Sequence, residues 1–221
     1  MPKVPVYENM IQERDVMVPM RDGVKLAVDI YRPAISGRAP ALYTCAMHNK
    51  DLQRPEVWES IPSQPAHSSL WFGIMEAGDS KRFVANGYAH VITQPRGVGK
   101  SEGEFMHGEW DHYDLIEWIA AQPWCDGNVG MVGISAFAGE QWLAAAQQPP
   151  HLKAIFPYDA CGAYGSPVGI RDFYPGGVLH TMLYLLEGFS CVHESRGLPQ
   201  ALPGPLEEMW EEAMNNPDYR K

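Results

Sequence analysis

Hydrophobic and polar residues alternate near the amino-terminal end of the chain in the manner of strands. Residues 15–19 (DVMVP) and 25–31 (KLAVDIY) each predict a strand. Between them lie residues 21–23 (RDG), and an Asp-Gly pair is a strong signal for a hairpin turn. A third, apolar strand is predicted over residues 39–46. The segment 47–73 that follows is rich in Pro, Ser and His, and predicts a long irregular loop of a kind that is usually functional or mobile.

From residue 76 onward the pattern changes to an alternation of helix and strand. An antiparallel hairpin followed by such an alternation predicts an α/β fold with a doubly wound, mostly parallel sheet. Ligands of such sheets bind at the carboxyl ends of the strands. The predicted helices cover residues 76–86, 109–122 and 140–146, and the predicted strands cover residues 88–94, 129–132 and 152–156.

The character of the chain shifts once more after the last predicted strand. Glycine and proline break the segment 162–177 into turns, and two helices are predicted at 179–189 and 206–215. No further alternating strand follows. We therefore expect an incomplete α/β core over residues 1–165 and a segment of a helical cap over residues 166–221.

Seven residues, 133–139 (GISAFAG), carry the clearest chemical signal. Ser135 lies where a predicted buried strand meets a predicted helix, which is the setting of a nucleophile elbow. Unpaired N–H groups and the helix dipole favour negative charge at such a point. The simple Gly-x-Ser-x-Gly pattern fails, because Phe137 stands at the second glycine. A serine that merely caps the helix is the alternative interpretation.

The composition of the chain argues against several classes of function. The chain has 221 residues, 45% hydrophobic, with 17 Lys and Arg against 27 Asp and Glu, a formal charge of −10. An acidic chain without a basic stripe is a poor candidate for binding nucleic acid or an anionic membrane surface. The apolar stretch 178–192 is too short and too polar to span a bilayer. A packed globular protein without nucleic-acid or membrane partners is expected.

The four cysteines are widely spaced and contain no Cys-x-x-Cys pair. The first residues lack the apolar core of a secretory signal, so reduced thiols in a cytoplasmic protein are expected. No cluster of His, Cys, Asp and Glu has the spacing of a metal site. We expect neither a metal nor another cofactor.

Four separated motifs stand out along the chain. They are residues 20–26 (MRDGVKL), 29–33 (DIYRP), 94–103 (QPRGVGKSEG) and 124–131 (WCDGNVGM). In these motifs, and in their order, the chain resembles the CocE/NonD serine hydrolases, the group related to Xaa-Pro dipeptidyl-peptidases. The segment around Ser135 resembles the Gly-x-Ser-Tyr-x-Gly of that family, which accounts for the failure of the simpler pattern.

The resemblance implies an α/β-hydrolase fold and hydrolysis of an ester or amide through an acyl-enzyme at Ser135. It implies that the backbone N–H of Ala136 donates to the oxyanion, a role that needs no side chain. Ala136 and Ala138 replace a family tyrosine and glycine. His48 stands where the family has a tyrosine whose hydroxyl is the second oxyanion donor. A histidine can donate as well, although a solvated loop histidine is the alternative.

No position in the chain matches the acid or the histidine of the family's catalytic triad. A self-contained triad of Ser135, Asp159 and His180 is conceivable, whereas His107 and His112 are expected at the surface, near the start of a helix. The base and acid could instead come from a missing carboxyl-terminal part or a partner chain. A truncated remnant or pseudoenzyme that only binds, or that self-associates through an exposed sheet edge, is the competing hypothesis.

Overall fold

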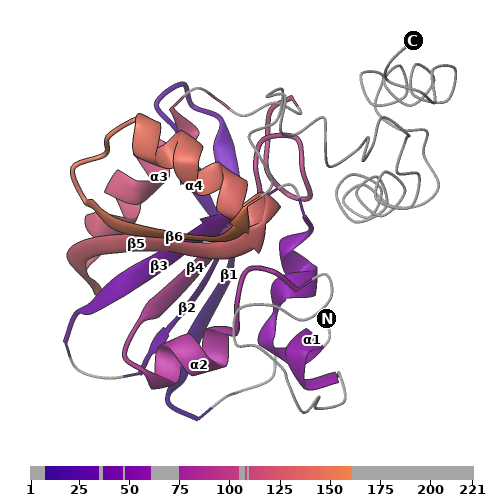
Figure 1. Ribbon diagram of the computed structural model, residues 1–221, viewed down its shortest axis with the longest axis vertical. Coiled ribbons are helices and arrows are strands. Elements are labelled where there is room, and N and C mark those ends of the chain that lie inside the picture. Colours follow the sequence, from indigo (N-terminus) through magenta and orange to yellow (C-terminus); the bar gives the residue numbers. More distant parts are fainter. Residues whose placement is uncertain are drawn as a thin grey trace, which may run out of the picture.

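A twisted six-stranded sheet forms the centre of the computed structural model, with strand order β1-β2-β4-β3-β5-β6 (Figure 1). The structure describes residues 8–34, 37–46, 48–60, 75–104, 108 and 110–160. The proposed cap over residues 166–221 therefore lies outside the described residues, as do His107, His180 and the boundary at residue 165.

The amino-terminal hairpin forms one antiparallel edge of the sheet. Strand β1 (Met10–Pro19) pairs with β2 (Lys25–Pro33), and β2 pairs in turn with β4 (Ala89–Thr93). The pairing of β1 with β2 shifts register between Glu13 and Val16. This bulge places Asp15 at a φ of 56°, so that its backbone N–H donates to the Asp29 carboxylate at 2.9 Å.

The remaining strands run parallel, as the helix–strand alternation predicts. Strand β3 (Ala39–Cys45) lies between β4 and β5 (Cys125–Ser135), and β6 (Leu152–Ala160) pairs with the outer side of β5. The carboxyl ends of β3, β4 and β5 therefore meet at one edge of the sheet. Ser135, the last residue of β5, lies at this edge.

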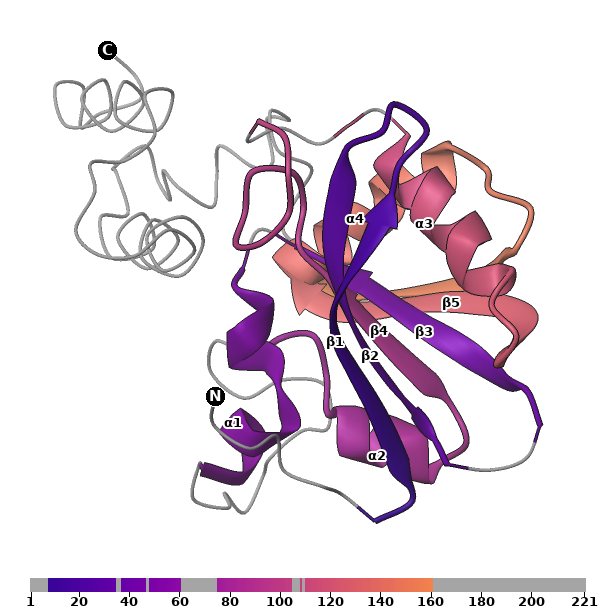
Figure 2. The same ribbon diagram turned by 180° about the vertical axis from the view of Figure 1, so that it is seen from behind.

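Helices cover both faces of the sheet, which gives the three layers of an α/β-hydrolase fold (Figures 1 and 2). Helices α3 (Asp111–Ala120) and α4 (Ala136–Ala146) pack on one face, where apolar side chains of β2, β3 and β5 form the larger core. Helix α2 (Ser80–Ala85) covers the other face. None of the helices in the described part of the chain is long and apolar enough to cross a membrane.

The segment after β3 differs from its prediction. Residues 47–73 were expected to form an irregular loop, but a 3-10 helix η1 (Lys50–Gln53) and a helix α1 (Pro55–Ser60) occupy part of it. The side chain of Asn49 caps η1 by accepting from the Asp51 N–H at 2.9 Å. Pro55 begins α1, where its missing N–H is not needed. The abundance of Pro, Ser and His concealed these short helices.

The prediction for His112 is wrong. Its side chain is 3% exposed, lies beneath α4 and makes two hydrogen bonds of 2.9 Å, to the Tyr43 hydroxyl and the Glu140 carboxylate. The imidazole therefore bridges the Tyr43 hydroxyl and the Glu140 carboxylate, each through one of its two ring nitrogens. Burial raises the pKa of Tyr43 well above its ordinary value and keeps it a donor. These contacts fix α4 to α3 and β3.

Arg96, in the motif after β4, joins three segments. Its guanidinium forms a two-pronged contact with Asp111 at the start of α3, at 2.6 and 2.7 Å, and a further bond with Asp22 in the hairpin turn. Hydrogen bonds from Arg96 to both carboxylates raise its pKa. Because the Asp111 side chain is nearly buried, this contact is more than a surface ion pair.

Replacement of Arg96 by methionine should lower the free energy of unfolding by about 3 kcal/mol, since Asp111 would then lack its countercharge. Arg32 is the matched control, because its contact with Glu13 is a single, more exposed ion pair. Arg32→Met should cost under about 1 kcal/mol. Urea denaturation followed by circular dichroism measures both values. Equal losses for the two variants would contradict the role given to Arg96.

Candidate active site

The turn between β5 and α4 has the backbone of a nucleophile elbow. Ser135 adopts φ 57° and ψ −118°, a conformation that side-chain-bearing residues rarely occupy. Such strain persists only where the surrounding structure enforces it, and it is common at functional sites. Helix α4 begins at the next residue, Ala136. The chain therefore turns from strand to helix within a single residue.

The Ser135 side chain makes no capping hydrogen bond to α4, so the interpretation of Ser135 as an ordinary helix cap is wrong. A capping serine has extended backbone angles and accepts from an N–H of the first turn. Ser135 has neither property. Its side chain is partly exposed at the carboxyl edge of the sheet, as a nucleophile requires.

Gly133 allows the turn to close. Its φ is 146°, and a Cβ atom at this position would lie 2.5 Å from the Phe137 Cβ and 3.2 Å from the Thr44 hydroxyl oxygen. A side chain would therefore clash with the first turn of α4. A glycine at position 133 is therefore required for this close approach.

A buried glutamine, Gln141, fastens the elbow to its neighbouring strand. Its Nε2 donates to the carbonyl oxygens of Gly133 (3.4 Å), Phe137 (3.2 Å) and Phe156 (3.2 Å), and its Oε1 accepts from the Phe156 N–H at 2.8 Å. Pro157, which has no N–H, lies opposite Gly133. The glutamine therefore supplies hydrogen bonds where the ladder has no backbone donor.

His48 lies against the elbow. Its side chain is 5% exposed, and its ring stacks on that of Phe137 with centroids 5.4 Å apart and planes inclined by 21°. The alternative of a solvated loop histidine is therefore wrong. The contact brings the segment after β3 next to the first turn of α4, where Ala136 begins the helix. The role of His48 as an oxyanion donor stays a prediction.

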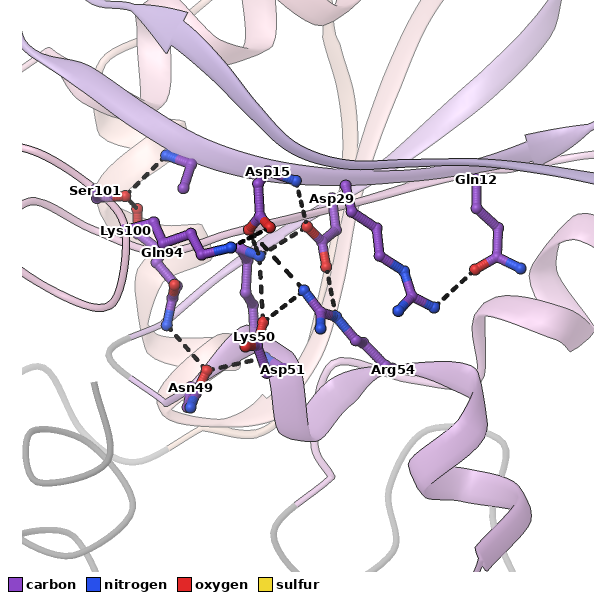
Figure 3. A network of polar contacts seen from close by, with 12 residues as sticks. Gln12, Asp15, Asp29, Asn49, Lys50, Asp51, Arg54, Gln94, Lys100 and Ser101 are labelled. Carbon is purple, nitrogen blue, oxygen red and sulfur yellow. Dashed lines mark hydrogen bonds and ion pairs between the residues drawn. The ribbon is translucent and has the colours of Figure 1, made fainter. Parts of the chain in front are cut away.

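The loop that carries His48 is anchored by buried charges (Figure 3). The Lys50 ammonium lies 2.7 Å from Asp29 Oδ1 and 2.6 Å from Asp15 Oδ1, and Arg54 Nε lies 3.0 Å from Asp29 Oδ2. The side chains of Lys50 and Asp29 are 1% and 0% exposed. We call Asp15, Asp29, Lys50 and Arg54 the charge clamp. Lys100 contacts the other oxygen of Asp15 from the surface.

The clamp did not emerge from the sequence. Its one visible signal is Asp29, a charged residue inside the otherwise apolar run of β2. Lys50 follows His48 closely but looks like an ordinary solvated lysine. Gln141 was also missed, because a glutamine on a helix gives no sign of its partners.

The other described histidines are engaged away from the elbow. His90 contacts Ser80 in α2, and burial lowers its pKa to about 3. It pairs through Leu42 with Gly130, five residues before Ser135, which separates it from the serine by about 16 Å along the strands. His151 pairs with Glu117 at the opposite end of the sheet. His112 is held by Tyr43 and Glu140.

Asp159 is an exposed residue near the end of β6, with φ 49°. Ser135 pairs with the residue after it, Ala160, across a register shift, so Asp159 lies on the strand beside the elbow. Its conceivable partner His180 is outside the described residues, and the triad stays a prediction. Within the described ranges no group of three or more His, Cys, Asp or Glu residues could hold a metal ion.

Comparison with known proteins agrees with this geometry. The model of the X-Pro dipeptidyl-peptidase (S15) family matches residues 22–188, well over half of the chain. The chain belongs to this family. The matched residues include the elbow at Ser135, the segment after β3 that carries His48, and the first turn of α4.

Named relatives of this S15 chain are hydrolases. It is 40% identical over 169 residues to cocaine esterase from Rhodococcus sp. (strain MB1 Bresler), an alignment that covers 75% of this chain and 26% of that protein. A CocE/NonD family hydrolase from Staphylococcus aureus superposes with a TM-score of 0.65 at 30% identity, covering 91% of this chain and 36% of that one. An α-amino acid ester hydrolase gives 0.63 at 25% identity, with 86% and 31% covered.

The chain spans about a quarter to a third of the length of the curated relatives that it matches. The α/β-hydrolase fold and membership of a hydrolase family are therefore established for the part that these comparisons cover.

Substitution of Gly133 by alanine should destabilise the fold by about 3 kcal/mol, because it adds a clash with Phe137 to an unfavourable φ. Gly23 is the control: its φ is 90°, but nothing lies within 4 Å of a Cβ there. Gly23→Ala should cost about 1 kcal/mol. Chemical denaturation distinguishes the two, and a Gly133→Ala protein as stable as Gly23→Ala would contradict the proposed crowding.

The charge clamp should make stability sensitive to acid. Burial raises the pKa of Asp15, but hydrogen bonds from Lys100 and Lys50 outweigh it and lower the pKa from 3.8 to about 2. The contribution of Asp15 is therefore fully present above pH 3.8 and is lost as the pH falls through about 2. In Asp15→Asn the free energy of unfolding should fall less steeply over this range. Denaturation curves at stepped pH measure the slope, and identical slopes would exclude the linkage.

Proposed function

We propose that the chain carries the nucleophile-bearing part of a serine hydrolase that cleaves an ester or amide bond through an acyl-enzyme at Ser135. The observation that carries the proposal is the backbone of Ser135, which is strained, ends β5 and leaves the side chain unused for helix capping. A hydroxyl presented in this way is available for attack on a carbonyl carbon.

In the first step, Ser135 Oγ forms a bond to the carbonyl carbon while a general base takes its proton. The carbonyl oxygen becomes an oxyanion, for which the Ala136 N–H at the start of α4 and a donor from His48 are the proposed hydrogen-bond donors. The tetrahedral intermediate collapses, and the alcohol or amine leaves with a proton. Water then attacks the acyl-enzyme and regenerates Ser135.

The general base is proposed to lie outside the described residues, and its acid to be either Asp159 or a residue outside them. His90, His112 and His151 are held by partners elsewhere, and His48 is assigned to the oxyanion. His180, a carboxyl-terminal continuation or a partner chain are the sources to test. A catalytic serine without a general base would be a weak nucleophile at neutral pH.

Esters are the first substrates to test. The relatives in the comparison include a cocaine esterase and an α-amino acid ester hydrolase. We therefore propose a small-molecule ester as the substrate class, with an amide as the second choice. A cytoplasmic location stays part of the proposal.

A fluorophosphonate probe tests the proposal directly. Wild-type protein should be labelled at Ser135 and should hydrolyse a short-chain p-nitrophenyl ester, and both activities should disappear in Ser135→Ala. Ser101→Ala is the matched control: this hydroxyl is buried and accepts from the Ala27 N–H, so labelling should persist. Absence of labelling in a folded wild-type chain would favour the remnant or pseudoenzyme instead. Labelling that survives Ser135→Ala would refute Ser135 as the nucleophile.

A further inference from the structure

The charge clamp holds the one segment that brings His48 to the elbow. His48 lies on a short connection between the end of β3 and η1, and Lys50 is the first residue of η1. The segment is fixed on one side by the stacking of His48 on Phe137 and on the other by the clamp. A single residue, Asn49, therefore separates His48, whose ring lies at the elbow, from Lys50, whose ammonium is buried.

The clamp is built so that Lys50 stays charged. Burial alone would lower the pKa of Lys50, but Asp29, Asp15 and Asp51 outweigh it and hold the pKa above its ordinary value. Each carboxylate has additional partners, because Arg54 and the Asp15 N–H reach Asp29, and Lys100 reaches Asp15. Removal of the Lys50 ammonium would leave Asp29 buried with less countercharge, a costly state that the loop would relieve by moving.

The neighbouring segments are joined to the same loop. Asn49 Oδ1 caps η1 and accepts from Gln94 Nε2 at 3.3 Å, and the Gln94 carbonyl accepts from the Ser101 hydroxyl at 2.8 Å. The Gln53 side chain, in the last residue of η1, accepts from the N–H groups of Glu76 and Ala77. These bonds connect the loop to the segments on either side of α2 and β4, but the ion pairs of Lys50 are its closest charged contacts.

We propose that Lys50 is a positioning residue for the oxyanion site, and that its ion pairs with Asp29 and Asp15 set the place of His48 beside the elbow. This inference rests on the proposed function, since the oxyanion belongs to that reaction. Lys50 itself touches no reacting atom. A displacement of a catalytic group by about 1 Å can lower a rate by two orders of magnitude, so a buried anchor of this kind is sufficient to govern the reaction.

The test compares Lys50→Met with Lys100→Met in the full-length protein. Both lysines contact Asp15, but the Lys100 side chain is 62% exposed and does not reach Asp29. We expect Lys50→Met to lower kcat for a p-nitrophenyl ester roughly tenfold or more with little change in KM. Lys100→Met should stay within about twofold of wild type, as expected for an exposed ion pair. Rates are divided by the active sites counted in the fluorophosphonate titration, which removes the effect of unfolded protein.

Two readouts separate positioning from general loss of structure. In a double-mutant cycle, Lys50→Met should cause little further loss of kcat in a protein that already carries His48→Ala. Both substitutions remove the same hydrogen-bond donor from its place. The preference for an ester over its thionoester should also fall in Lys50→Met, since sulfur accepts hydrogen bonds poorly. Independent, multiplicative losses or an unchanged preference would overturn the inference.

Amide hydrogen exchange tests the anchoring role of Lys50 without a measurement of catalytic activity. Amides of residues 49–53 should exchange at least tenfold faster in Lys50→Met than in Lys100→Met, while those of α3 stay unchanged. Equal exchange in the two variants would refute the anchoring role. If the activity depends on Ser135 but kcat is unchanged in Lys50→Met, the positioning role of Lys50 is refuted while the proposed function stands. Activity that is independent of Ser135 refutes the proposed function.

Discussion

The rest of the proposed site depends on one backbone constraint, the turn from β5 into α4 within a single residue. This turn requires positive φ at both Gly133 and Ser135, and neither is a low-energy state for a residue with a side chain. Contacts around the turn hold it in place: Gln141 bonds to the strands, and the Glu140–His112–Tyr43 chain fixes α4 from below. The strain at the serine is therefore supported by buried polar groups on the same helix.

The hydrophobic periodicity of the sequence was sufficient to predict most helices and strands of the described core. The hairpin, the strands and the helices after residue 76 were all predicted, because each buries one apolar face or a short apolar run. Their ends differed by a few residues for local reasons. For example, α2 begins at Ser80 rather than at residue 76 because Asp79 accepts from the N–H groups of its first turn.

Failures of the prediction fall on polar residues whose partners are distant in the chain. His112 looked like a surface residue at the start of a helix, and only the packing of α4 shows that Glu140, twenty-eight residues later, meets it. Lys50 and Asp29 appeared unrelated for the same reason. The elbow, by contrast, is contained in seven consecutive residues, and its serine was identified directly. Pairings across a fold leave no local trace in one sequence.

The charge clamp has a consequence for the order in which the chain is made. Asp15, Asp29, Lys50 and Arg54 all precede the elbow in the sequence, as does their outer partner Lys100. A ribosome that synthesises the chain from its amino terminus has therefore supplied every buried charge of the clamp before it reaches Gly133. The charge clamp that positions His48 and the catalytic serine belong to separate stretches of the nascent chain. They come together only when β5 enters the sheet beside β3.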